Sequence, residues 1–437
     1  MSFDNLFTRA KEKGFDDVQI FLTGNRDLSI EVFEGETEKY EIADTTSLTI
    51  KATKDGKMVT FVTEVINDSE IEFIVDEMLK NVEIITSTDK SEIYAGDPEY
   101  QKMTGMYNKE LEDMDVKEKI DIAKNLDELI QHEDPKVKTV ESQYGESSRT
   151  ILLQNTKGLK LTDHLNSGYL GASVIVNDGK DQRTNFDAII SNDFVDFQPK
   201  ELSAEIVKTA VDSLGAKPVP SKKYPIVFDR NATSILLSAF MQIFSAENVQ
   251  KDMSLLKGKL ETRIGSEKVN IADDPFRKKS SLSRSFDDEG VATKYKMLVE
   301  NGILKTYLHN LKTAKKDGVK STGNGFRGSV DATNFTLLPG DKTKEELIGS
   351  LQEGLYIIEV QGAHAGANPV SGDFSLQAMG FVIRDGKQAE PVALITVASN
   401  FIDFLTNIED VANDIKTTIY GITCPSVKVR PLSVSGL

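Results

Sequence analysis

The chain has few histidines and cysteines, the side chains that commonly bind zinc or act as a base or a nucleophile. Its histidines are His132, His164, His309 and His364, and its single cysteine is Cys424. A zinc site takes three or four protein ligands, yet no two histidines lie within a helical turn and no His-Glu-x-x-His occurs. A site built from His309, His364, Cys424 and a carboxylate would need the fold to assemble it. We interpret each histidine as a surface or hydrogen-bonded side chain.

The sequence also lacks the motifs of a catalytic nucleophile and of a nucleotide-binding loop. Cys424 lies in Ile422-Thr423-Cys424-Pro425 without a base nearby in the sequence, so we expect a buried, unreactive thiol. No Gly-x-Ser-x-Gly is present, and Gly323-Asn324-Gly325 lacks the lysine and hydroxyl residue of a phosphate-binding loop. We therefore predict no catalytic residue in this chain.

The segment Gln361–Gly380, called the glycine-rich segment below, is the main candidate for a binding loop. It holds four glycines, the pair Asn368-Pro369 and the run Ser371-Gly372-Asp373, between two apolar, strand-like stretches. Glycines at this density let a backbone take positive φ and approach a ligand closely, and loops held between strands often carry binding residues. The alternative is a long hairpin connection with ordinary turn chemistry.

The acidic loop Asp287-Asp288-Glu289 is the second candidate. Three adjacent carboxylates suit a cation or a substrate amine, while the alternative is a solvated acidic turn. Its case as a binding site depends on whether it faces the glycine-rich segment.

Composition limits the class of protein. The chain has 437 residues, 28% of them charged, and a net charge of −17, which argues against nucleic acid as a direct partner. No apolar run reaches membrane-spanning length, and the N-terminal residues read as an amphipathic helix without the apolar core of a signal peptide. With one cysteine and no possible disulfide within the chain, we expect a cytoplasmic protein.

Three domains are expected to hold these loops. Residues 1–85 read as a β-meander with helices, residues 110–216 as a central α+β domain, and residues 222–437 as the C-terminal domain, after the proline-containing boundary Ala216–Ser221. The fold class is α+β, with a strand-rich N-terminal part, capping helices and a larger mixed C-terminal domain. The expected elements include short strands at 18–22 and 28–33, hairpin turns at Asp55-Gly56 and Asn301-Gly302, and helices at 231–244 and 401–413.

Three segments resemble the TldD/PmbA (TldE) family. They are Ser285–Gly290 (SFDDEG), His364–Ser375 (HAGANPVSGDFS) and Pro425–Gly436. The resemblance covers most of the chain, and Asn-Pro-x-Ser-Gly-Asp-Phe-Ser is its most specific motif. It implies a cytoplasmic metallopeptidase system that pairs a TldD-type with a PmbA/TldE-type subunit. The family is also called modulator of DNA gyrase and is linked to peptide-antibiotic maturation and antitoxin turnover.

The chain departs from the TldD type at the metal motif. TldD-type chains carry His-Glu-x-x-x-His on the first helix of the C-terminal half, where two histidines bind zinc and the glutamate is the general base. The equivalent stretch here is Ser238–Ile243 (SAFMQI), which lacks both ligands and the base. The resemblance therefore implies a PmbA/TldE-type subunit that holds no metal itself, with zinc on a TldD-type partner.

Under this reading the binding residues serve a peptide. His364, Asn368, Ser371, Gly372 and Asp373 would line or brace a peptide cleft, and Asp288 and Glu289 would add polar contacts. The partner would be a TldD-type chain or a second copy. Two alternatives stay open: a metallopeptidase in its own right with an unrecognised metal site, and a homodimeric peptide-binding or scaffold protein without proteolytic activity.

Overall fold

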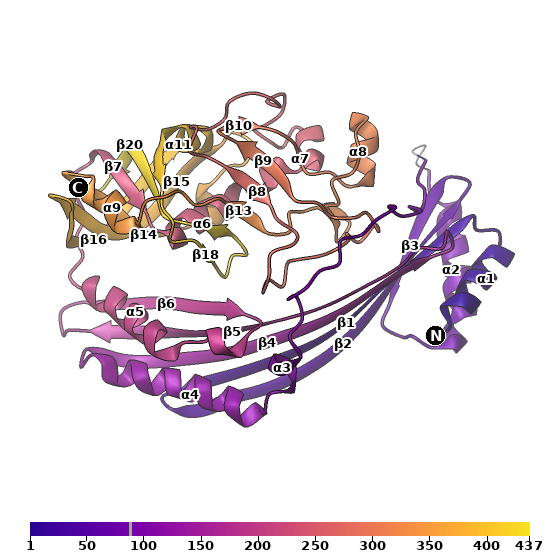
Figure 1. The fold of residues 1–437 in the computed structure, drawn as a ribbon, viewed down its shortest axis with the longest axis horizontal. Helices are drawn as coiled ribbons and strands as arrows, with labels where there is room; N and C mark the ends of the chain where they lie inside the picture. Colours follow the sequence, from indigo (N-terminus) through magenta and orange to yellow (C-terminus); the bar gives the residue numbers. More distant parts are fainter. Residues whose placement is uncertain (87–89) are drawn as a thin grey trace.

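In the computed structural model, which describes residues 1–86 and 90–437, the first half of the chain forms one long antiparallel sheet (Figure 1). The strand order is β3-β2-β1-β4-β5-β6. The bounds are β1 Asp17–Phe33, β2 Glu36–Lys54, β3 Lys57–Thr63, β4 Val137–Asn155, β5 Lys160–Asn177 and β6 Gln182–Ser191. Because β1 pairs with β4 from Gln19↔Asn155 to Phe33↔Glu141, strands of the expected N-terminal and central domains share this sheet.

Two pairs of helices cover one face of the sheet. Ile20 of β1 packs in a core with α1 (Phe3–Glu12) and α2 (Ile71–Glu83), and Ile30 packs with α4 (Val116–Glu133) and α5 (Pro199–Asp212). Side chains alternate between the two faces along a strand, so these two even-numbered residues place both helix pairs on the same face. The other face is left for the C-terminal half of the chain (Figure 1).

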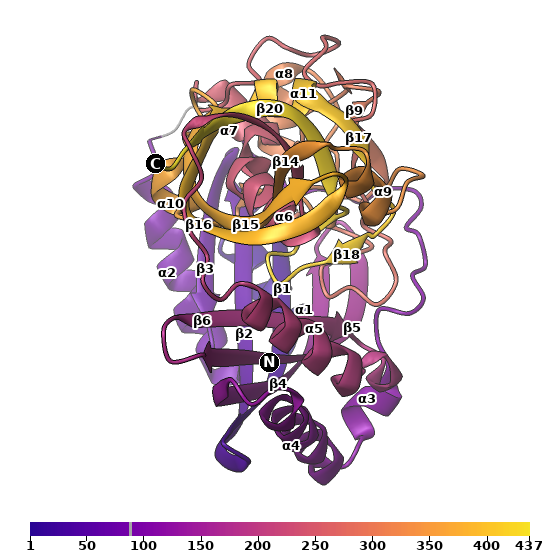
Figure 2. The ribbon, with the colours of Figure 1, turned by 90° about the vertical axis from the view of Figure 1, so that its left-hand side faces the viewer.

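The C-terminal half contains a closed barrel. Its sheet has the order β16-β15-β14-β7-β20-β17, and β16 also pairs with β20, which closes β16, β15, β14, β7 and β20 into a ring with β17 attached to β20. The strands curve around helix α6, Arg230–Phe240 (Figure 2). The bounds are β7 Lys222–Phe228, β14 Glu353–Gln361, β15 Asp373–Arg384, β16 Lys387–Asn400, β17 Ile408–Val411 and β20 Val427–Ser435.

A second, smaller sheet lies beside the barrel. Its order is β10-β9-β8-β13-β19-β18, with bounds β8 Ile271–Asp273, β9 Lys296–Glu300, β10 Ile303–Leu304, β13 Phe335–Leu337, β18 Lys416–Thr417 and β19 Thr423–Cys424. The strands β11 Gly325–Phe326 and β12 Ser329–Val330 form a separate pair. The remaining helices are α3 Lys109–Asp113, α7 Ala246–Gln250, α8 Leu311–Asp317, α9 Lys344–Gly349, α10 Ala363–Gly366 and α11 Phe401–Asn407, with 3-10 turns at Asp68–Glu70, Phe194–Asp196 and Met241–Phe244.

The expected α+β class is confirmed, and the differences from expectation are local. The strands expected at 18–22 and 28–33 are one strand, because the polar stretch between them keeps its pairing with β2 and β4. The helix expected over 401–413 ends at Asn407, because Ile408 pairs with Val429 in the barrel. Both hairpin turns form with positive φ at their two central residues, as a type I′ turn requires.

One apolar cluster joins the long sheet to the C-terminal half. Ile151, Leu153 and Leu165 from the sheet pack with Met106 from the connecting segment and with Phe286 from the C-terminal half. Each of these side chains is at least 94% buried, so the two halves share a small core. None of the described helices combines the length and apolar character needed to cross a membrane.

One buried carboxylate in this fold lacks full hydrogen bonding. Asp127 on α4 is buried, its Oδ1 accepts from Gln131 Nε2 at 2.6 Å, and its Oδ2 has no hydrogen-bond partner within the described residues. Burial raises the pKa of Asp127 to about 6, from an ordinary value of 3.8. The charged form is therefore disfavoured in the folded state.

We expect Asp127→Asn to stabilise the protein above pH 6 and to have little effect at pH 4. The folded pKa lies above the unfolded one, so the penalty appears as pH rises from about 4 to 6 and is complete above that. The gain in unfolding free energy at pH 8, measured by urea denaturation, should be about 3 kcal/mol, because the folded pKa lies about two units above the ordinary value. The exposed neighbour Glu128→Gln is the control. A gain that is the same at both pH values would contradict this account.

Candidate functional site

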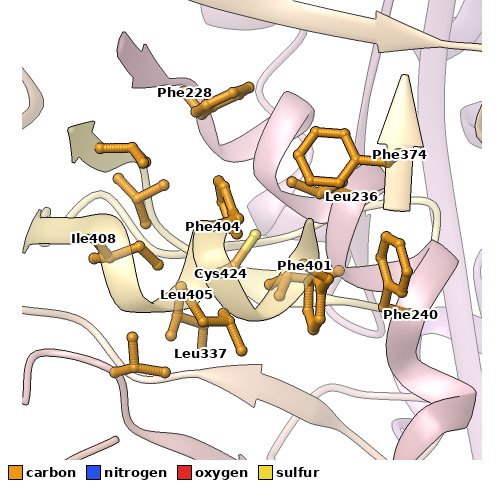
Figure 3. Packing of buried hydrophobic residues seen from close by; sticks show 14 of the residues in the cluster. Phe228, Leu236, Phe240, Leu337, Phe374, Phe401, Phe404, Leu405, Ile408 and Cys424 are labelled. Carbon is orange, nitrogen blue, oxygen red and sulfur yellow. The ribbon is translucent and has the colours of Figure 1, made fainter. Parts of the chain in front are cut away.

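Helix α6 lies at the centre of the candidate site and is fixed from both ends. At its start, the Asp229 carboxylate accepts from Asn231 N at 2.9 Å and from the Tyr356 hydroxyl at 2.6 Å. At its end, the Phe240 ring stacks on Phe401 with centroids 4.3 Å apart (Figure 3). Capping and aromatic packing therefore hold the helix in one position inside the barrel.

The positions that correspond to the family's metal motif offer no metal donors. Ser238 donates its hydroxyl to Ile235 O at 2.8 Å, Ala239 presents a methyl group, and Ile243 is fully buried in the barrel core. Zinc in proteins takes Cys, His, Asp or Glu ligands. These three side chains do not fit a zinc ion. The described part of the chain also contains no group of three or more such ligands placed around one point.

The glycine-rich segment begins beside this helix. Gly362 takes φ 79°, which turns the chain from β14 into the single turn of α10. Ala363 and Ala367 pack against the same barrel core as Ile235 and Ala239. Helix α10 therefore lies against α6, while His364 remains exposed.

A tight set of hydrogen bonds shapes the next residues. Asn368 Oδ1 accepts from Val370 N at 2.9 Å and Ser371 N at 3.3 Å, and Asn368 O accepts from Gly372 N at 2.7 Å. Gly372 takes φ 85°, and a Cβ added there would lie 2.9 Å from Asn400. Only glycine meets both conditions, so this turn is strongly determined.

Asp373 is tied to the neighbouring strand. Its Oδ1 accepts from Asn400 Nδ2 at 3.0 Å, and the same amide donates to Ser371 O at 2.9 Å. Hydrogen bonds from Asn400 and Ser371 hold the pKa of the exposed Asp373 below its ordinary value. Asn368, Ser371, Gly372 and Asp373 thus form one rigid loop, with His364 exposed at its start.

The acidic loop is a different kind of structure. Asp287 is fully buried, and its carboxylate accepts from three backbone groups: Glu289 N at 3.0 Å, Val291 N at 2.9 Å and Gly325 N at 2.8 Å. Burial raises the pKa of Asp287 to about 8, the charge of Glu289 adds to this, and the three N–H donors oppose it. Its hydrogen bonds fix the loop's own backbone.

The other two carboxylates also make internal contacts. Asp288 accepts from Arg284 Nη2 at 3.2 Å and from Arg327 N at 2.8 Å. Glu289 accepts from Leu311 N at 2.7 Å at the start of α8, and burial raises the pKa of Glu289. None of the described hydrogen bonds or ion pairs links Asp288 or Glu289 to the glycine-rich segment. Their predicted peptide contacts stay a prediction.

Sequence reasoning missed the residues that anchor the acidic loop. Arg284 pairs with Asp163 of β5, with Nε and Oδ2 3.7 Å apart, and its guanidinium lies over the rings of Phe286 and Phe326. Asp163 also accepts from Ser285 N at 3.0 Å and Ser285 Oγ at 2.7 Å. Burial raises the pKa of Asp163, and the Ser285 hydrogen bonds oppose this. Arg284 directly precedes the SFDDEG segment, but no sequence signal distinguished Asp163.

The other three histidines and the cysteine each lie in a different environment. His309 is buried, burial lowers its pKa, and its Nδ1 has no partner among the described residues. His132 contacts Glu128 O on α4, and His164 stacks on Tyr107 with centroids 3.7 Å apart. Cys424 lies among the buried apolar side chains of the barrel core (Figure 3). Its thiol donates to Arg230 O at 3.3 Å, and burial raises its pKa. A reactive thiolate is therefore disfavoured at Cys424.

Comparisons with known proteins agree with this architecture. A family model described as the PmbA/TldA metallopeptidase C-terminal domain matches residues 221–436, and one described as the central domain matches residues 109–214. A curated relative named metalloprotease PmbA homolog, from Buchnera aphidicola, is 29% identical over 264 residues, which cover 60% of this chain and 58% of that protein.

Solved structures match over the whole chain. A Thermotoga maritima protein described as a putative modulator of a DNA gyrase has a TM-score of 0.93 and 38% identity, and the match covers 99% of each chain. TldE from Thermococcus kodakarensis has a TM-score of 0.92 and 22% identity and covers 100% of each chain, a likeness that concerns the fold.

We expect Arg284→Met to destabilise the protein by about 3 kcal/mol, because it removes the cation that pairs with the Asp163 and Asp288 carboxylates. The measurement is the urea midpoint and slope. Arg327→Met, at an 84% exposed side chain, is the control and should change stability little. Adding Asp163→Asn to Arg284→Met should recover part of the loss. A loss below about 1 kcal/mol would show that the pair is dispensable.

Proposed function

Because the chain belongs to the PmbA/TldD metallopeptidase family, we propose that it acts as the metal-free, PmbA/TldE-type subunit of a cytoplasmic peptidase complex. The complex acts on peptides or unfolded segments, and a TldD-type partner supplies the zinc and the general base. In this assignment the chain shapes the substrate cavity and holds the peptide without cleaving it.

The observation that carries the proposal is the identity of the side chains on α6. By the resemblance, α6 corresponds to the helix that carries the zinc ligands in TldD-type chains, but Ser238 donates its hydroxyl to Ile235 O in the same helix and Ile243 is buried in the core. Gln242 Nε2 donates to Asp331 at 2.6 Å, so this polar side chain is engaged as well. In this proposal α6 has a structural role, because its side chains at these positions make contacts within the chain.

The glycine-rich segment supports a role in holding a peptide. Its rigid turn presents the exposed side chains of Asn368, Ser371 and Asp373, with His364 one helical turn earlier. A loop whose own hydrogen bonds are already made loses little entropy when a ligand binds. An extended peptide displays N–H and C=O groups that match such carboxylate, amide and hydroxyl groups.

We expect the purified chain to contain no stoichiometric zinc. The donors at positions 238, 239 and 243 are a hydroxyl, a methyl and an aliphatic group, none of which is a zinc ligand of choice. Elemental analysis after exposure to zinc and dialysis measures this directly. One tightly held zinc per chain would support the alternative of a metallopeptidase in its own right and reject the proposed role.

We expect a TldD-type chain carrying His-Glu-x-x-x-His to co-purify with this chain and to hydrolyse unfolded peptides. His364→Ala and Asp373→Ala should each lower kcat/KM by about tenfold while the pair still assembles, because positioning contacts are lost. His132→Ala, an exposed histidine on α4, is the control. Stable self-pairing without hydrolysis would favour the homodimeric binding or scaffold alternative.

A further inference from the structure

A narrow groove lies where the barrel meets β6 of the long sheet. Its volume is about 120 Å³, and part of its lining belongs to the glycine-rich segment: Gln361, Gln377, Ala378 and Met379. The groove is lined by side chains from four strands: Arg183 of β6, Glu359 and Gln361 of β14, Gln377 and Met379 of β15, and Leu394 of β16.

Leu394 has a conformation that its residue type disfavours. It takes φ 57°, in the left-handed region, where a bulky side chain is strained. The other non-glycine residues with positive φ in the described part of the chain are Asn, Asp, Glu, Lys or Arg. Leu394 is the apolar exception, and it lies at a register irregularity between β15 and β16.

The same side chain is also exposed to water. Leu394 is 67% exposed, so its strain is not offset by burial in the core. A glycine or asparagine at this position would relieve the backbone strain and remove apolar surface from water. In the isolated chain, Leu394 therefore costs free energy through its backbone strain and through its exposed apolar surface. A contact made by the isobutyl group with a ligand would account for both features.

The rest of the groove favours one kind of ligand. Gln361 and Gln377 are opposite each other on β14 and β15. The Gln361 amide donates to Glu359 Oε1 at 2.8 Å, so its oxygen can accept from a peptide main chain, and the Gln377 amide can both donate and accept. Arg183 is paired with Asp181, with Nε and Oδ2 2.8 Å apart, and Glu359 accepts from Gln361 Nε2 at 2.8 Å. Both charges of the lining are therefore engaged within the chain, and the groove has no strong preference for a charged ligand. The volume of about 120 Å³ leaves room for one large side chain.

We propose that this groove is a subsite for one large hydrophobic side chain of an extended peptide, with Leu394 as its apolar contact and the two glutamines as main-chain contacts. The inference rests on the proposed function in one respect, that the ligand is a peptide. It adds a preference: segments with exposed leucine or phenylalanine, as unfolded proteins display, bind better than polar ones.

The test uses the purified full-length chain without a partner and two fluorescein-labelled peptides of Gly, Ser and Lys. One has a central Phe, and the other has Ser at that place. By fluorescence anisotropy we expect about tenfold tighter binding of the Phe peptide, which corresponds to partial burial of the ring. Leu394→Gly should abolish this preference, and Leu394→Met should retain it.

The Leu394→Gly variant has a second readout that a merely structural residue would not show. It should raise the urea midpoint, since glycine tolerates positive φ, while it weakens binding of the Phe peptide. Glu261→Gly, at another exposed residue with φ 57°, is the matched control and should leave the peptide preference unchanged.

Three outcomes would overturn the inference. They are equal binding of the two peptides by the natural chain, an unchanged preference in Leu394→Gly, and loss of self-association in Leu394→Gly, which would assign the groove to a second copy. Failure of the proposed function looks different. A complex that does not hydrolyse peptides leaves the Phe preference intact, and a complex that hydrolyses Phe and Ser peptides equally well leaves the function intact without the subsite.

Discussion

The buried contacts of Asp163 in the long sheet with Arg284 and Ser285 in the C-terminal half tie the two halves together at the acidic loop. Charged groups removed from water must be paired, and Arg284 is held by two carboxylates and two aromatic rings. Asp163 belongs to the long sheet and Arg284 to the C-terminal half, so satisfying one requires docking the other. The apolar cluster around Phe286 adjoins this pair and gives the docked state its hydrophobic contribution.

This contact also changes the meaning of the acidic loop. Three adjacent carboxylates suggest a cation site in the sequence, but in the fold their oxygens accept hydrogen bonds from backbone groups and from Arg284. The raised pKa of Asp287 reflects burial within a junction. A perturbed carboxyl can mark a functional site, yet ion-pair networks and closed turns perturb pKa values as well.

The turn of the glycine-rich segment and the groove differ in the type of residue that takes positive φ. The turn at Asn368–Asp373 makes its own hydrogen bonds and carries its positive φ at Gly372, where it costs least. Leu394 places positive φ and an exposed apolar side chain at one residue, where both cost free energy. A preformed turn beside an exposed apolar side chain suits a surface that binds peptides of different sequences.

Local interactions could be predicted from the sequence, and long-range ones could not. The hairpin at Asn301-Gly302 follows from residues adjacent in the chain, since type I′ turns favour that pair. The α+β class follows from alternating apolar patterns in the same way. The sequence also determined the missing metal donors at Ser238–Ile243, because donor chemistry is a property of residue type.

Only the tertiary structure decided that β1 and β4 pair across more than a hundred residues, that the helix at Phe401 stops where Ile408 joins β20, and that Asp163 meets Arg284. Those contacts depend on which distant segments meet, and hydrophobic periodicity carries no information about the partner that a strand or a carboxylate will find.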